Sequence, residues 1–269
     1  MSGFFTAAAR GDEAWPVAQA EVLVVVSDFD GTLAEFSADP MNVPINAVAT
    51  RALYDLAALA GTSVTILSGR DLAALGVVSG LQEPIALVGS HGAETSVGGP
   101  SPEQERQLAD IAAVLEPIAA RHEGAFVEVK PYHRVLHVRQ VPDELAAELI
   151  DAAAAVDPGG LTRTFGKKVL EFGVTDITKG TWLAQEVSRQ LGRLPQAAPA
   201  GTLGVVFLGD DRTDEDGFEA LAQLPADERL VVETVKVGAG DTAATVRVED
   251  VQAVGAYLRA LADARLRRR

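Results

Sequence analysis

The chain has 269 residues, 48% of them hydrophobic, and a formal net charge of −15 at pH 7. This acidity argues against nucleic acid as a partner, because phosphate backbones attract basic patches. The absence of cysteine excludes disulfides, thiolate zinc sites and cysteine catalysis, and no apolar run approaches the roughly 20 residues that a membrane span needs.

The first part of the chain alternates apolar runs with helical patterns. Residues 1–20 contain Asp12 and Glu13 and lack a signal-peptide core, so we expect an exposed leader and a cytoplasmic protein. The apolar, largely β-branched run at 22–26 predicts a strand over 22–27 that is buried on both faces of a parallel sheet. The pattern then predicts helices at 45–60 and 71–78 and strands at 63–67 and 85–88.

The middle of the chain has a different pattern, and its start is marked by residues that break helices and strands. Gly98-Gly99-Pro100-Ser101-Pro102 is the strongest boundary signal in the chain. A helix is expected over 103–121, with Pro117 kinking or ending it. Strands at 125–130 and 135–141, a helix at 143–156 and strands at 161–165 and 168–172 complete the block. We therefore expect an inserted α+β domain over 98–174 with an antiparallel sheet.

After this insertion the alternation of strands and helices resumes. The patterns predict strands at 204–208 and 230–237 and helices at 181–191, 218–224 and 251–261. The predicted fold class is α/β. A doubly wound parallel-sheet core is expected from residues 21–97 and 175–269, and the inserted α+β domain would act as its cap.

Polar clusters directly follow three of the predicted strands. They are Asp28-Phe29-Asp30-Gly31-Thr32-Leu33, Ser68-Gly69-Arg70 and the acidic stretch Gly209–Asp216. Ligands bind at the carboxyl ends of strands in open α/β sheets, so the clusters are expected to meet in one crevice. Asp28 and Asp30 would point the same way, which favours a cation or a shared proton between them. A solvated turn or a helix cap is the alternative.

Carboxylates in this arrangement predict a magnesium site. Mg²⁺ prefers octahedral oxygen ligands and retains several waters. Asp28, the backbone carbonyl of Asp30 and Asp210 could supply those ligands, and Asp214 could orient a ligand or a water. Asp211 is a weaker candidate, because its neighbour uses the inward direction.

The same clusters could support covalent phosphoryl transfer, which mainly needs positioning and charge neutralisation. Asp28 is the expected nucleophile and Asp30 the general acid and base. The hydroxyl of Ser68 and the backbone N–H groups from Gly69 onward could bind phosphoryl oxygens. Lys179 lies near a predicted helix start, where a cation is unfavourable, so an anionic ligand or a carboxylate is expected beside it. A solvated lysine is the alternative.

The predicted cap offers polar side chains that could recognise what the phosphate is attached to. Lys167 and Glu171 are four residues apart on a predicted strand, so both would face one side, with Lys168 on the other. A cross-strand salt bridge at the surface is the alternative. Weaker candidates on the cap strands are Lys130, His137 and Arg139.

Three further candidates precede the predicted inserted domain in the chain. Glu94, in a glycine-containing loop, could reach a sugar from the junction between the domains. His91 could orient that loop or contact the substrate. Arg70 could assist the phosphate or the sugar, or could pair with Asp71 or Glu94.

Taken in order, these segments resemble the four motifs of haloacid-dehalogenase-superfamily phosphatases. More narrowly, the chain is similar to trehalose-6-phosphate phosphatases, from about Val22 to the C-terminal helix. That similarity rests on Gly89-Ser90-His91-Gly92-Ala93-Glu94, on Gly166-Lys167-Lys168-Val169-Leu170-Glu171 and on the long Gly209–Asp216 form of the last motif. It implies a core of this superfamily with a C2B-like cap, and Mg²⁺-dependent hydrolysis of trehalose 6-phosphate, the last step of trehalose biosynthesis.

Position by position, the resemblance implies the roles already assigned from the residues. Asp28 and Asp30 would act as nucleophile and acid/base, Ser68 and Lys179 would hold the phosphate, and the metal ligands would be Asp28, Asp30 and Asp210, supported by Asp214. The sequence departs from the family after Glu171, where Phe172-Gly173-Val174 replaces the usual basic residue and proline. Residues 129–139 only partly fit the cap strand of the family.

Other functions remain open at this point. The same fold could act on sucrose phosphate or a hexose phosphate, or could return the phosphoryl group to the sugar as a phosphomutase. A non-enzymatic sensor is disfavoured because Asp28 and Asp30 are both present. A dinucleotide-binding dehydrogenase or P-loop kinase is disfavoured because their glycine motifs are absent. A small sugar phosphate is the expected partner and a monomer the expected state.

Overall fold

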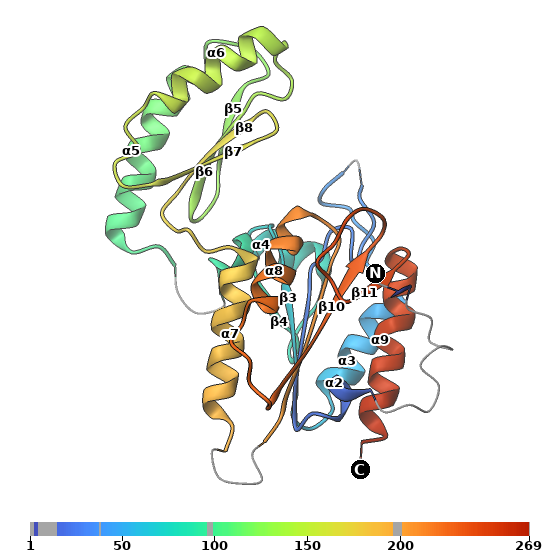
Figure 1. Ribbon diagram of the computed structural model, residues 1–269. Helices are drawn as coiled ribbons and strands as arrows, with labels where there is room; N and C mark the ends of the chain where they lie inside the picture. The colour runs from blue at the N-terminus through green and yellow to red at the C-terminus, as the bar shows by residue number, and fades with distance from the viewer. Residues whose placement is uncertain (1–2, 5–14, 38, 96–98, 196–200, 269) are drawn as a thin grey trace. The chain divides into compact units, whose positions relative to one another are not determined.

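The computed structural model describes residues 3–4, 15–37, 39–95, 99–195 and 201–268. The chain divides into two compact units (Figure 1). We call Met1–Thr95 with Ile177–Arg269 the core unit, and Ser96–Asp176 the inserted unit. Gly98, where the inserted domain was predicted to begin, lies outside the described residues, as do residues 1–2 and 5–14 of the predicted leader.

The core unit is built on a seven-stranded parallel sheet. Its strand order is β1-β11-β10-β9-β2-β3-β4. The central strand β2 (Val22–Ser27) pairs with β9 (Leu203–Gly209) on one side and with β3 (Thr62–Leu67) on the other. Because all three run parallel, their carboxyl ends meet at one edge. The remaining strands are β1 (Gly3–Phe4), β4 (Ala86–Val88), β10 (Leu230–Val237) and β11 (Val246–Val248).

Helices cover both faces of this sheet (Figure 1). Leu23 and Val25 pack with residues of the helices α2 (Pro16–Gln19), α3 (Ala47–Ala57) and α9 (Val251–Leu266). Val24 and Val26 pack on the opposite face with α7 (Lys179–Arg193) and α8 (Arg212–Ala222). Burial on both faces explains why the run is continuously apolar. The last two helical elements of the unit are α4 (Leu72–Ser79) and the 3-10 helix η1 (Ser90–Gly92).

The prediction of an exposed leader is wrong over residues 15–20. Trp15, Val17 and Ala18 are buried in the core of the unit. The indole Nε1 of Trp15 donates to both carboxylate oxygens of Glu233, at 3.1 Å each. With only four residues, α2 is too short to show a helical period, so its burial depends on packing that the sequence pattern does not reveal.

The inserted unit has a four-stranded antiparallel sheet of order β5-β6-β8-β7. Its helices α5 and α6 and one face of the sheet enclose a separate apolar core that includes Leu136, Leu170 and Phe172. In chain order its elements are α5 (Pro102–Ala119), β5 (Phe126–Val129), β6 (His133–His137), α6 (Asp143–Ala154), β7 (Thr162–Gly166) and β8 (Val169–Gly173).

The predicted placement of Lys167 and Glu171 on one strand is wrong. Gly166 pairs with Val169, so Lys167 and Lys168 form the turn between β7 and β8. The backbone of Lys168 has φ 59, in the left-handed region, which suits a tight turn. Because the chain reverses at this point, the two-residue alternation of a strand does not extend from Glu171 back to Lys167.

The α/β prediction, with a parallel core sheet and a separate antiparallel sheet, is confirmed. Strand β11 was missed, because a three-residue strand is too short to show a pattern. Among the described residues, no helix combines the length and the apolar character that crossing a membrane requires.

Candidate active site

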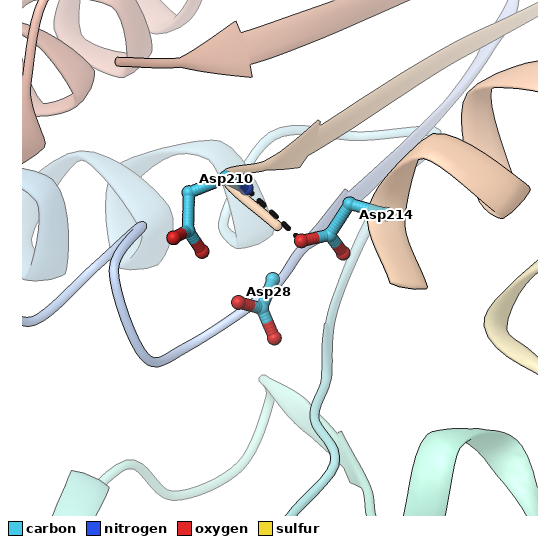
Figure 2. A group of neighbouring side chains, drawn as sticks. All are labelled: Asp28, Asp210 and Asp214. Atoms are coloured by element: carbon cyan, nitrogen blue, oxygen red, sulfur yellow. Dashed lines mark hydrogen bonds between the residues drawn. The ribbon is translucent and has the colours of Figure 1, made fainter. Parts of the chain in front are cut away.

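Three aspartates converge at the carboxyl edge of the central strands, and we call Asp28, Asp210 and Asp214 the acidic cluster (Figure 2). Asp28 directly follows β2, Asp210 follows β9, and Asp214 lies in the first turn of α8. Each residue offers one carboxylate oxygen, and these oxygens all lie within 4.8 Å of one another. The structure therefore brings together residues that are about 180 positions apart in the chain, as expected when parallel strands share an edge.

Lys179 lies between two members of the acidic cluster. Its Nζ is 2.7 Å from Oδ1 of Asp28 and 2.8 Å from Oδ1 of Asp214, and the side chain is only 2% exposed. Lys179 is the first residue of α7, with Thr178 as its N-cap. The sequence predicted an anion or a carboxylate beside this lysine, and the two aspartates provide that partner. One buried ammonium group thus interacts with two buried carboxylates. Without these partners, burying any of the three charges would cost free energy of folding.

Asp214 is held on both carboxylate oxygens. Its Oδ2 accepts the backbone N–H groups of Asp210 and Asp211, at 3.0 and 3.1 Å, and its Oδ1 accepts Lys179. A Cβ added at Gly209 would lie 2.1 Å from the Cγ of Asp214, so glycine is required there. Asp211 itself caps α8 through the N–H groups of Thr213 and Asp214. Asp214 therefore fixes the loop that carries Asp210.

Asp210 lies against Gly31. A Cβ at Gly31 would be 2.2 Å from Oδ2 of Asp210, and its φ of 76 also favours glycine. The backbone carbonyl of Asp210 accepts a hydrogen bond from Lys236, which is buried and also donates to the carbonyl of Val237 at 2.9 Å. Sequence reasoning missed Lys236. The available signal was a lysine inside the predicted strand at 230–237, in a chain with few lysines.

The acidic cluster carries more negative charge than Lys179 neutralises. Burial, together with Asp214 and Asp211, raises the pKa of Asp210 to about 6. Burial also raises the pKa of Asp28, and Lys179 only partly offsets it. Burial works to lower the pKa of Lys179, but the two adjacent carboxylates raise it overall. A further cation would remove this excess charge, so the donor set fits a metal ion.

Ser68 and Arg70 bring the second cluster to the same edge. Ser68 follows β3, is buried, and its Oγ accepts the N–H of Arg70 at 3.2 Å. Arg70 donates two hydrogen bonds of 2.6 Å to the carboxylate of Asp30. The sequence left Arg70 open to pairing with Asp71 or Glu94, and Asp30 is the partner in the structure. Asp71 instead caps α4 through the N–H of Ala74, at 2.7 Å.

The loop that contains His91 and Glu94 is hydrogen-bonded to the second cluster, Ser68-Gly69-Arg70. The N–H groups of Ser90 and His91 donate to the carbonyls of Arg70 and Ser68, at 2.7 and 2.9 Å. Both residues have positive φ, 46 and 56, which is uncommon without glycine. Glu94 is 8% exposed and accepts from the hydroxyl of Ser90 and from the N–H of Leu72 at 3.1 Å. In this structure Glu94 therefore fastens the loop to the start of α4.

Three sugar-binding candidates of the inserted unit have partners within it: Glu171, Lys130 and His137. Nε2 of His133 lies 3.5 Å from Oε1 of Glu171, in the strand next to it. Glu128 pairs with His137 at 2.8 Å and lies 4.0 Å from Nζ of Lys130. Lys168 pairs with Asp143, and the exposed Arg139 follows β6 in a turn.

The chain is similar to known proteins along most of its length. Residues 26–252 match the family model described as trehalose-phosphatase. The chain is 34% identical over 251 residues to a trehalose-phosphate phosphatase of Mycobacterium marinum, covering 89% of this chain and 61% of the relative. It is 30% identical over 249 residues to the trehalose-6-phosphate phosphatase of Escherichia coli, covering 88% and 85%.

Solved structures show the same fold. The trehalose-6-phosphate phosphatase of Aspergillus fumigatus superposes with a TM-score of 0.71 at 25% identity, covering 98% of this chain and all of that one. The chain spans about three fifths of the length of the first mycobacterial relatives. The resemblance inferred from the motifs is therefore confirmed at the level of the family: the chain belongs to the trehalose-phosphatase family of the haloacid-dehalogenase superfamily.

Proposed function

We propose that this chain is a Mg²⁺-dependent phosphatase that hydrolyses trehalose 6-phosphate to trehalose and phosphate through an aspartyl-phosphate on Asp28. The observation that carries the proposal is the contact of Lys179 with both Asp28 and Asp214, beside Asp210. The carboxylate proposed as nucleophile and the ammonium proposed to neutralise the phosphate are adjacent, and both lie within the family match over residues 26–252. The names of the relatives support trehalose 6-phosphate as the substrate.

In the first step, an oxygen of Asp28 attacks phosphorus and the bond from phosphorus to the sugar oxygen breaks. Asp30 gives its proton to that oxygen, so the sugar leaves as a neutral alcohol. In the second step, Asp30 takes a proton from water, and the resulting hydroxide attacks phosphorus. The bond from phosphorus to Asp28 breaks, and phosphate is released with Asp28 as a carboxylate again.

Two side chains would bind the phosphoryl group during both steps. Lys179 would neutralise charge on its oxygens, and the hydroxyl of Ser68 would donate to another oxygen, helped by the backbone at Gly69. Because Lys179 and Ser68 are both buried, these interactions act in a medium of low dielectric constant, where they are stronger than in water.

Asp28, Asp210 and the backbone carbonyl of Asp30 would hold Mg²⁺, with Asp214 fixing the position of Asp210. The ion would supply positive charge against the transferred phosphoryl oxygens. Hard oxygen ligands suit Mg²⁺, which needs few carboxylates and keeps several waters.

Phosphate release from trehalose, sucrose and glucose phosphates, each with Mg²⁺ and with EDTA, tests the proposal. We expect trehalose 6-phosphate to be turned over fastest and EDTA to abolish turnover until Mg²⁺ is restored. Equal rates on the three sugar phosphates would remove the substrate assignment. Full activity in EDTA would remove the metal, and transfer of the phosphoryl group to another position of the sugar would indicate a mutase.

The inserted unit is proposed to recognise the sugar, and Glu171 is the residue with which to test this. We expect Glu171→Ala to raise KM for trehalose 6-phosphate about 10-fold or more, because a charged hydrogen bond contributes about 1.5–3 kcal/mol. The steady-state kinetics of 4-nitrophenyl phosphate, which has no sugar, should stay nearly unchanged. Glu148→Ala, an exposed change on α6, is the control. Matching losses on both substrates would show that Glu171 is structural. Contacts of Lys130, Arg139 and Lys167 with the sugar stay predictions.

A further inference from the structure

Arg70 holds the carboxylate of Asp30 in a fork. Its Nε donates to Oδ2 and its Nη2 to Oδ1, both at 2.6 Å. Two parallel charge-assisted hydrogen bonds fix the plane of a carboxylate as well as its position, which a single ammonium contact does not do. The two side chains are 16% and 27% exposed, so the pair is partly shielded from solvent.

Arg70 is itself held from several directions. Its Nη1 donates to the carbonyl of Pro40 at 2.6 Å, and its guanidinium carbon lies 5.8 Å from the ring centroid of Phe29. Its backbone N–H donates to Oγ of Ser68, and its carbonyl accepts the N–H of Ser90 at 2.7 Å. These contacts hold Arg70 in place beside the end of β3, where the second cluster lies.

We propose that Arg70 is a positioning residue that fixes the Asp30 carboxylate for proton transfer, and that it does not bind the sugar. This inference rests on the proposed function. A carboxylate has about four acceptor sites, and the fork uses two of them. The others remain free to exchange a proton with the leaving oxygen or with water. Three of the five side-chain N–H groups of Arg70 donate to Asp30 and Pro40, which leaves two for a substrate.

The test compares Arg70→Met and Arg70→Lys on a sugar phosphate and on 4-nitrophenyl phosphate. On trehalose 6-phosphate we expect kcat to fall about 10²-fold in both variants with little change in KM, since proton transfer contributes about 10²–10⁴-fold. Lysine keeps the charge but not the fork, so it should not rescue the rate. Added guanidinium ion, at concentrations that leave the fold intact, should restore part of the kcat of Arg70→Met.

With 4-nitrophenyl phosphate, formation of the aspartyl-phosphate can be observed separately from its hydrolysis. Nitrophenolate leaves without a proton, so formation of the aspartyl-phosphate should survive in Arg70→Met. Its hydrolysis needs Asp30 as a base and should be slow. We expect rapid release of about one nitrophenolate per active site, followed by slow turnover.

A matched control is Arg229→Met. Arg229 forms the same kind of fork on Asp227, with contacts of 3.0 and 2.6 Å, and both side chains are half-buried in the loop before β10. The Arg229→Met change should leave kcat unchanged, and circular dichroism should show that all variants are folded. A higher KM for the sugar phosphate alone would make Arg70 a sugar contact and overturn the inference. Equal losses on both substrates without a burst or guanidinium rescue would also overturn it. A wild-type chain that releases no phosphate from either substrate would instead remove the proposed function.

Discussion

Replacing Asp28 with asparagine is expected to lower steady-state phosphate release from trehalose 6-phosphate by at least about 10³-fold, because loss of a nucleophile removes the covalent route. The amide is nearly isosteric and can still accept from Lys179, so the fold should be retained. Phosphate release and the circular dichroism spectrum measure the two outcomes. Asp151→Asn, an exposed change on α6, is the control and should have full activity. Turnover undiminished by Asp28→Asn would overturn the covalent mechanism.

The second large effect is on stability, and we expect it when Arg265, near the end of α9, is replaced. It is 4% exposed, and it donates to the carbonyls of Ala18, Glu21 and Gly61, at 3.0, 3.0 and 3.1 Å. Burial lowers its pKa to about 10, so it stays charged at neutral pH. Arg265 thus joins α9 to the segment before β2 and to the segment before β3.

Arg265→Ala should lower the free energy of unfolding by about 3–5 kcal/mol, because several buried carbonyls lose a charged donor at once. Urea unfolding followed by circular dichroism measures this. Arg268→Ala is the matched control, since the exposed Arg268 donates to the carbonyl of Glu21 at 3.1 Å and should contribute no more than about 0.5 kcal/mol. A loss below about 1 kcal/mol for Arg265→Ala would contradict this role.

The predictions made before the structure differed in accuracy for a physical reason. The strands at 22–27 and 230–237 were predicted at their observed bounds. The first is a continuous apolar run up to Ser27, as expected for a parallel strand that is buried on both faces. The helix predicted at 218–224 begins six residues earlier, at Arg212, because its first turn is the acidic motif itself and carries no apolar period. Lys167 was misplaced because Lys167 and Lys168 form the turn between β7 and β8, so the alternation of β8 does not reach back to Lys167.

By itself, the sequence determined the family, the α/β class and the positions of Asp28, Ser68 and Asp210, since clusters that follow parallel strands must meet at one edge. The tertiary structure alone decided which distant residues contact one another. Arg70 meets Asp30 across 40 residues, and Arg265 meets Ala18 across 247. Such contacts depend on packing between distant segments, which leaves no periodic trace in the chain.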